Sequence, residues 1–321
     1  MQPHGFRRHL NAVVRVVLSV AIVGALAYLV GTADTLNQLK AVRWQVIALV
    51  TLVLASHVFV VAPRWAAILT ALGSPLRSSA LIGSVFLGFL FNQLLPTAVG
   101  GDALRAWRAH RLGSPLDIAI HSVLLDRVSG IVVVLAGSVV LLPFMHLPVV
   151  PQVLWWTAAT GIVGGLAGVA LLWALGSMPT SRMALIARLQ HTLVSFNGSV
   201  AVLLRHPGAA FSVIAYAIAG QFIVVGAIWL LANEVQIHLP LVDITVITFG
   251  AMLASAVPIS VAGWGLREGA LIFLFGAYGV PADKTFAVSV LFGACMMAAS
   301  LPGAFVLLDR RLGPMPHAND R

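Results

Sequence analysis

The sequence contains little charge and almost no cysteine. Only 9% of its 321 residues are charged and 60% are apolar, with a mean hydropathy of +1.00, whereas soluble domains carry roughly 25% charged residues. Cys295 is the single cysteine, which excludes an internal disulfide and a cluster of thiolate metal ligands. The longest polar segment, residues 177–206, is too short to form a soluble domain with its own core. This composition is typical of an integral membrane protein.

The sequence also lacks the motifs of metal, nucleotide and hydrolase sites. Its ten histidines show neither H-E-x-x-H nor Cys/His spacing, and no phosphate-binding glycine loop or nucleophile motif occurs. A net charge of +9 would favour nucleic acid in a soluble protein. Here, however, the arginines lie in short segments between apolar runs, a pattern that reports membrane orientation. We therefore expect no metal, no cofactor and no nucleic-acid partner.

Six apolar runs are long enough to cross a bilayer, which takes about 20 helical residues. They cover residues 12–30, 44–62, 119–142, 153–176, 209–232 and 285–307. The run 12–30 exceeds the apolar core of a signal peptide, so we interpret it as an uncleaved anchor. The sequence thus predicts an all-α, polytopic helical bundle that forms one membrane domain over residues 1–321.

Two further apolar stretches, residues 78–95 and 243–280, are interrupted. The first is followed by a break that contains Pro96, Gly100 and Gly101. The second is divided by the break 258–265, which contains Pro258, Gly263 and Gly265. If both are re-entrant hairpins, the arginine-rich loops 1–11, 63–77, 98–118, 177–206 and 308–321 all face the cytoplasm, as the positive-inside rule requires. We therefore predict cytoplasmic termini in a bacterial or archaeal cytoplasmic membrane. Broken backbone at membrane depth persists only inside protein or beside water, so a cavity is expected.

The two breaks resemble each other. The segments 94-LLPTAVGGDALRA-106 and 256-AVPISVAGWGLRE-268 align Pro96 with Pro258 and Arg105 with Arg267. Short Pro/Gly matches also arise by chance in a glycine-rich chain, but a second block around residues 113–125 and 279–291 aligns in the same order. The halves 1–150 and 151–321 are therefore predicted to be inverted repeats, each with three spans and one hairpin. In transporters such repeats place a binding site near the bilayer midplane.

Arg105 and Arg267 each follow a glycine-containing break and begin a helical stretch. Free N–H groups and the dipole at a helix N-terminus favour anions, and an arginine adds a bidentate fork for phosphate or carboxylate. Together the two arginines are expected to hold an anionic headgroup. For Arg105 a purely orienting, positive-inside role fits equally well.

Other polar residues near the breaks have more than one interpretation. Asp102 and Glu268 fit helix capping, pairing with the arginines or carrying a proton, and Asn92 is placed to satisfy backbone groups that the first break frees. Asp126 and Arg127 lie near the midplane if their helix begins at residue 116. They lie at the membrane surface if 116–127 is a separate interfacial helix.

The segment between the predicted spans 153–176 and 209–232 shows the periodicity of a helix. Apolar residues recur every three or four positions from Met183 to Leu203, which predicts an amphipathic helix on the inner leaflet.

Three segments resemble a known family: 92-NQLLPTAVGGDALRAW-107, 125-LDRVSG-130 and 258-PISVAGWGLREGALIFLFGAYGVP-281. They are similar to the flippase-like membrane region of the lysylphosphatidylglycerol synthetases, over nearly the whole chain. The resemblance implies a polytopic lipid-handling protein. It also implies that two motifs carry over to this sequence: Asn92, Pro96, Gly101, Asp102 and Arg105, and Pro258, Gly263, Gly265, Arg267 and Glu268. The soluble aminoacyl-transferase domain of those synthetases has no counterpart in the 321 residues, so we do not expect synthesis of lysyl-lipid.

The function predicted from these features is a lipid translocator that is not an enzyme. It would bind the anionic headgroup of a phospholipid or lipid-linked intermediate through Asn92, Asp102, Arg105, Asp126, Arg127, Arg267 and Glu268. Two alternatives stay open at this stage. One is a membrane transferase, or an accessory subunit of a lipid-modifying enzyme, acting on lipid-linked sugars or hopanoid-type lipids; the other is a transporter of small solutes.

Overall fold

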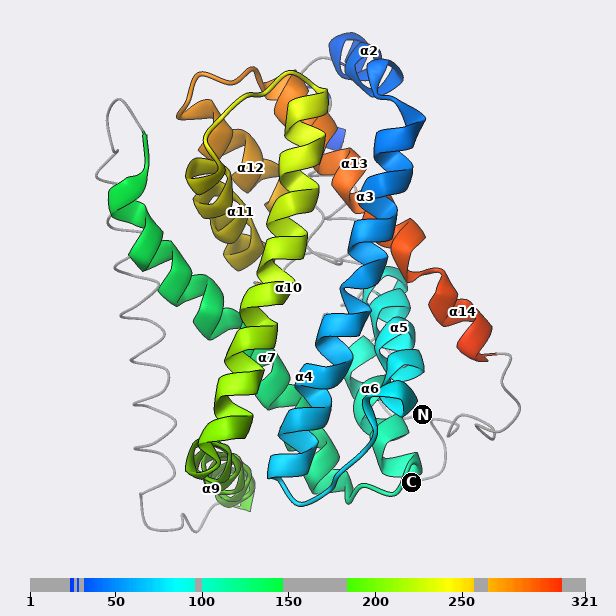
Figure 1. Ribbon diagram of the computed structural model, residues 1–321, viewed down its shortest axis with the longest axis vertical. Helices are drawn as coiled ribbons and strands as arrows, with labels where there is room; N and C mark the ends of the chain where they lie inside the picture. The colour runs from blue at the N-terminus through cyan, green and yellow to red at the C-terminus, as the bar shows by residue number, and fades with distance from the viewer. Residues whose placement is uncertain are drawn as a thin grey trace.

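The chain is helical throughout the part that its structure describes. A computed structural model describes residues 24–25, 28, 32–95, 100–146, 184–256 and 265–307. In chain order these ranges contain α2 (Thr32–Ala41), α3 (Trp44–Ser56), α4 (Val58–Ala71), α5 (Ser78–Leu94), α6 (Gly100–Arg111), α7 (Leu116–Leu141), the short 3-10 helix η1 (Leu142–Phe144), α9 (Ala184–Arg205), α10 (Pro207–Glu234), α11 (Leu241–Ala256), α12 (Leu266–Gly276), α13 (Ala282–Ser300) and α14 (Pro302–Leu307). Figure 1 shows α10 beside the line formed by α3 and α4, both parallel to the long axis of the molecule.

Four of the described segments are long and apolar enough to cross a membrane. They are Trp44–Ala71, Leu116–Phe144, Pro207–Glu234 and Ala282–Val306. These segments confirm four of the predicted apolar spans, to within a few residues at most ends. The predicted span 153–176, and 12–30 apart from three of its residues, lie outside the described part of the chain.

The predicted span 44–62 is too short at its C-terminal end. α3 and α4 together form one 28-residue segment with a turn at His57, and the helix continues to Ala71. The sequence suggested an end at residue 62 because Pro63 and Arg64 interrupt the apolar run. Arg64 is instead buried inside α4, where it faces a carboxylate of α7. Its assignment to a cytoplasmic loop is therefore wrong.

α7 is a single helix from Leu116 to Leu141. A separate interfacial helix over residues 116–127 is therefore not formed, because the helix continues through Asp126 and Arg127 without a break. Asp126 lies ten residues after Leu116, which is about 15 Å along the axis at 1.5 Å per residue. Its depth in a bilayer stays a prediction.

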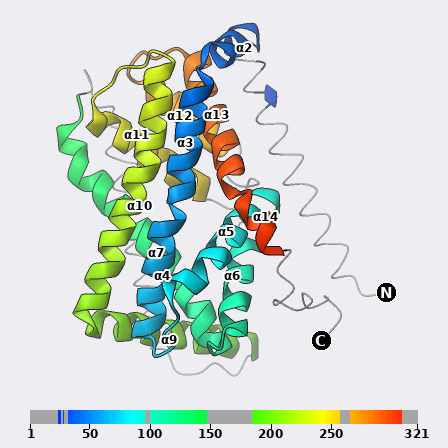
Figure 2. The same ribbon diagram turned by 45° about the vertical axis from the view of Figure 1, so that its right-hand side comes forward.

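The same order of helices occurs twice. A 28-residue segment is followed by two shorter helices and a long one, first as α3–α4, α5, α6 and α7, and again as α10, α11, α12 and α13. Figures 1 and 2 both show α5 and α6 toward one end of the long axis and α11 and α12 toward the other. The elements of the two predicted hairpins are thus present as helix pairs. Their re-entrant course and the inversion of the repeats stay predictions.

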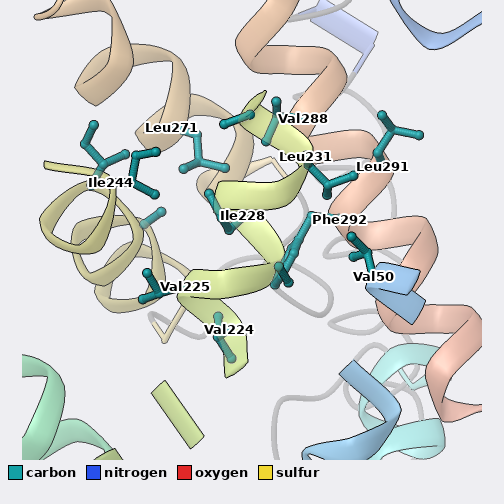
Figure 3. Close-up of a cluster of buried hydrophobic side chains, with 14 of the residues drawn as sticks. Val50, Val224, Val225, Ile228, Leu231, Ile244, Leu271, Val288, Leu291 and Phe292 are labelled. Atoms are coloured by element: carbon teal, nitrogen blue, oxygen red, sulfur yellow. The ribbon is translucent and has the colours of Figure 1, made fainter. Parts of the chain in front are cut away.

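The largest of the described apolar cores surrounds α10. Figure 3 shows Val224, Val225, Ile228 and Leu231 of α10 among side chains of four other helices. These partners include Val50 of α3, Ile244 of α11, Leu271 of α12, and Val288, Leu291 and Phe292 of α13. In lipid, where tails are as apolar as leucine, such a core is stabilised mainly by close van der Waals packing. This packing fixes the second helix pair against the bundle.

α9 confirms the helix that was predicted from the apolar periodicity of its sequence. Its described apolar residues Phe196, Val200 and Leu203 pack on Ile68 and Leu125, which belong to α4 and α7. The Oγ atom of Ser199 also lies 3.0 Å from the Nδ1 atom of His121. α9 therefore uses part of its apolar face to bind the bundle, and Figure 2 shows it lying across the end of the molecule where α10 begins.

Candidate functional site

The two helices of the first hairpin approach each other backbone to backbone. A Cβ atom added to Gly101 would lie 2.1 Å from the carbonyl oxygen of Gly88, so a larger residue does not fit without displacing one helix. Oδ1 of Asn92 accepts a hydrogen bond from the N–H of Gly101 at 3.1 Å. That bond satisfies one of the backbone donors that the start of a helix leaves free. Asn92 thus ties the end of α5 to the start of α6.

A buried aspartate next to this junction bridges two arginines from different helices. Oδ1 of Asp126 accepts a hydrogen bond from Nε of Arg64 at 2.6 Å, and Oδ2 accepts one from Nη2 of Arg105 at 2.9 Å. The exposed fractions are 1% for Asp126, 2% for Arg105 and 8% for Arg64. Charges this deeply buried are tolerated only with close pairing, because removing each ion from water costs several kcal/mol.

A second aspartate extends the network toward the surface. Asp102 of α6 accepts two hydrogen bonds from Arg127, with its Oδ2 atom 2.7 Å from Nε and its Oδ1 atom 2.9 Å from Nη2. The same Oδ1 atom lies 3.6 Å from Nη1 of Arg105. Five side chains of alternating sign thus form one chain of contacts, in the order Arg64, Asp126, Arg105, Asp102 and Arg127. We call this chain the first charge cluster.

An aromatic ring supports the buried end of the first charge cluster. The guanidinium group of Arg105 lies over the ring of Trp65, 4.4 Å from its centre, where the electron-rich face of an indole attracts a cation. Trp65 is fully buried, and its Nε1 donates a hydrogen bond to Oγ of Ser122 at 2.9 Å. Arg105 is thus held from one side by a carboxylate of α7 and from another by a ring of α4.

A second, smaller cluster lies at the start of α12. Nη2 of Arg267 donates to Oε1 of Glu268 at 2.7 Å, and the Oγ of Ser289 donates to the same oxygen at 3.0 Å. The other carboxylate oxygen of Glu268 accepts the backbone N–H of Gly265, whose φ of +93° suits a glycine. Arg267 also lies over Phe292, with its Cζ atom 5.3 Å from the ring centre. We call Arg267, Glu268 and Ser289 the second charge cluster.

Both charge clusters fall within residues 13–303, the range that matches the family model described as "Lysylphosphatidylglycerol synthase TM region". The chain belongs to this family. It is also similar to a protein named "UPF0104 membrane protein" from Methanothermobacter thermautotrophicus, with 24% identity over 322 residues and 89% of each chain covered. These findings confirm the resemblance that the two sequence motifs indicated. They identify the chain as a family member built around a helical membrane region.

In this family member the predicted site residues divide between the two clusters. Asp102, Arg105, Asp126 and Arg127 lie in the first charge cluster, with Asn92 at its edge, whereas Arg267 and Glu268 lie in the second. The described interactions thus form two clusters that share no residue, and a headgroup site formed by both arginines stays a prediction. Gly100 begins α6 and Gly265 precedes α12. Pro96, Pro258 and Gly263, which were predicted to break the helices, lie outside the described residues.

Sequence reasoning missed three members of these arrangements. Arg64 and Trp65 were hidden by the expectation that the span had already ended, and Ser289 has no local feature that separates it from other serines. One signal was present for Arg64. It follows an apolar run closely, and another predicted span contains an aspartate, Asp126. An arginine can be buried in a membrane span when a carboxylate pairs with it and offsets the cost of burying its charge.

Proposed function

We propose that this protein moves a lipid with an anionic, phosphate-containing headgroup between the two leaflets of the membrane. The observation that carries the proposal is the first charge cluster, which holds three arginines against two aspartates where α4, α6 and α7 meet. Arginine presents a planar fork of donors that matches phosphate oxygens. The headgroup would lie at the α5–α6 junction while the acyl tails stay in lipid.

The energetics of the cluster favour a functional role over a purely stabilising one. Ionisable residues inside membrane spans are costly and usually face a cavity, where they mark substrate pathways. Replacing a buried ion pair with well-packed apolar residues is often neutral or stabilising. A five-membered charged chain in so apolar a protein is therefore poorly explained by stability alone.

Membership of a family defined by a membrane region supports a lipid-related role. The repeated helix order, with the two helix pairs toward opposite ends of the molecule, supports alternating access. In transporters built from inverted repeats, rocking of one repeat against the other opens a central site first to one side and then to the other. We extend this mechanism to the two helix pairs as part of the proposal.

Reconstituted vesicles provide the test. Purified protein is placed in vesicles that contain a fluorescent phosphatidylglycerol, and a membrane-impermeant quencher reports the labelled headgroups that reach the outer leaflet. We expect faster exchange than in protein-free vesicles, with loss of that rate in Arg105→Gln. The matched control is Arg77→Gln, which alters an exposed arginine in the loop between α4 and α5. Vesicles in which the protein leaves the exchange rate unchanged would refute translocation.

Mass spectrometry of the same vesicles distinguishes translocation from catalysis. A translocator leaves every lipid mass unchanged, whereas a transferase supplied with a donor lipid produces a new mass. The predicted orientation, with the termini in the cytoplasm, is tested in parallel with two variants in intact cells, each with one cysteine added to a Cys295→Ala background. Arg77→Cys should react with an impermeant maleimide only after the cells are opened, and His238→Cys, near the other end, should react before. The opposite result would reverse the proposed topology.

A further inference from the structure

The two halves of the chain repeat their helices but not their charges. The segments Trp44–Ala71 and Pro207–Glu234 begin 163 positions apart (207 less 44), and α7 and α13 begin 166 positions apart (282 less 116). With these shifts, Arg64 corresponds to Ala227 and Trp65 to Ile228. Asp126 corresponds to Phe292, and Arg127 to Gly293. Of the first charge cluster, the second half therefore retains only Arg105, as Arg267.

The replacing residues form part of a dry core. Ala227 and Phe292 are 0% exposed and Ile228 is 1% exposed, and Figure 3 shows Ile228 and Phe292 in the apolar packing around α10. Arg267 lies over Phe292, the residue at the position where Arg105 meets the carboxylate of Asp126 in the first half. The second half thus keeps an arginine against the corresponding position of α13 but has apolar side chains in place of the charged partners.

The two clusters also differ in net charge. In the second charge cluster Arg267 is balanced by its neighbour Glu268, and their exposed fractions are 4% and 0%. In the first, three arginines face two aspartates, which leaves one positive charge. Arg127, at its outer end, keeps 49% of its side chain exposed, and Nε of Arg105 has no hydrogen-bond acceptor among the described residues. Only the first cluster combines a surplus positive charge with a guanidinium group, that of Arg127, that reaches the surface of the molecule.

We infer that the headgroup binds at the first charge cluster alone, and that this cluster selects a lipid whose headgroup has one net negative charge, as a phosphodiester without a cationic group carries. The pair Arg267–Glu268 is then a structural pair that fastens α12 to α13, and not half of a shared binding site. The inference rests on the proposed function, because it assigns the ligand class of the same site. It differs from the sequence expectation that Arg105 and Arg267 hold the headgroup together.

Binding to the detergent-purified full chain tests the inference without requiring transport. The probes are water-soluble dihexanoyl lipids, and the readout is the rise in unfolding temperature, which follows ligand affinity. Dihexanoylphosphatidylglycerol, with one negative charge, should stabilise the protein, and zwitterionic dihexanoylphosphatidylcholine should not. Glycerophosphoglycerol, the same phosphodiester headgroup without acyl chains, is the third arm. Equal stabilisation by glycerophosphoglycerol would identify a free phosphodiester as the ligand and would overturn the assignment to a lipid.

Charge variants then locate the site. Arg127→Gln removes the surplus charge of the cluster. It should lower the affinity for dihexanoylphosphatidylglycerol by about tenfold, a factor that corresponds to roughly 1.4 kcal/mol of binding free energy. Asp102→Asn raises the net charge to two. It should shift preference toward dihexanoylphosphatidate at pH 8, because a phosphate monoester with a second pKa of about 6 then carries two negative charges. An unchanged lipid preference in both variants would overturn the inference.

The double variant Arg267→Gln with Glu268→Gln is the matched test of the second cluster. Its unfolding temperature should fall while its affinity for dihexanoylphosphatidylglycerol stays within about twofold of the parent. If the folded double variant loses that affinity, Arg267 contributes to headgroup binding and the inference is overturned. If the double variant does not fold, Arg267→Lys, which keeps the charge beside Glu268 but removes the planar fork of donors, provides the comparison. If the parent binds the lipid but vesicle exchange is absent, translocation fails while the binding inference stands.

Discussion

Asp126 is the residue whose loss should destabilise the protein most. Its two carboxylate oxygens each accept a hydrogen bond from a buried arginine, Arg64 at 2.6 Å and Arg105 at 2.9 Å. Asp126→Asn keeps the shape of the side chain but removes its charge. Both guanidinium groups, with 8% and 2% of their residues exposed, then lose a charged acceptor and have little access to water. Removing one partner of a buried ion pair costs about 3–5 kcal/mol.

That free energy corresponds to a large change in melting temperature. At about 2–4 °C per kcal/mol for chains of 150–250 residues, Asp126→Asn should unfold roughly 10 °C below the parent. The assay heats detergent-solubilised protein and measures the fraction that still elutes in the peak of the unheated protein in size-exclusion chromatography. Asp117→Asn, an exposed aspartate in the first turn of the same helix, is the control. Its loss of helix-dipole stabilisation should cost at most about 1 kcal/mol.

A double-mutant cycle separates pairing from general disruption. Arg64→Met alone leaves Asp126 bound to Arg105, and Arg64→Met combined with Asp126→Asn should cost less than the sum of the single changes, because the two residues share one interaction. If Asp126→Asn unfolded within 2 °C of both the parent and Asp117→Asn, the claim that Asp126 neutralises two buried arginines would be refuted.

Three further predictions concern other parts of the molecule. Gly101→Ala should destabilise the protein by about 1–3 kcal/mol through overpacking against α5, whereas Gly269→Ala, with nothing within 4 Å of the added Cβ, should be neutral or stabilising in the same melting assay. Tyr278→Phe removes the hydrogen bond that its hydroxyl donates to buried Asp243 at 2.6 Å and should cost about 1.5–3 kcal/mol, as expected for a bond to a charged group; an unchanged melting curve would contradict this. Cys295, which is 1% exposed, should react with a maleimide only as the protein unfolds, and rapid labelling of the folded chain would show that α13 packs differently.

The sequence by itself determined the helical class, the position of most spans and the two interrupted segments. The reason is that lipid offers no partner for backbone N–H and C=O groups, so a spanning segment has to be a long apolar helix, and such a run is visible in the sequence alone. The pairing of Arg267 with Glu268 was also accessible, because the two residues are adjacent. Local polarity gave a wrong helix end at Arg64, because the sequence does not show that a charged residue is buried within the helix.

Only the tertiary structure decided which charges meet. Arg64 and Asp126 lie 62 positions apart, and Asp102 and Arg127 lie 25 apart, so nothing in the local pattern of either residue specifies its partner. The close approach of α5 and α6 at Gly101 and the packing of α4 on α7 bring these side chains together. The division of the polar residues into an open, positively charged cluster and a closed, neutral one follows from this packing, because burial and distance determine whether two charges neutralise each other.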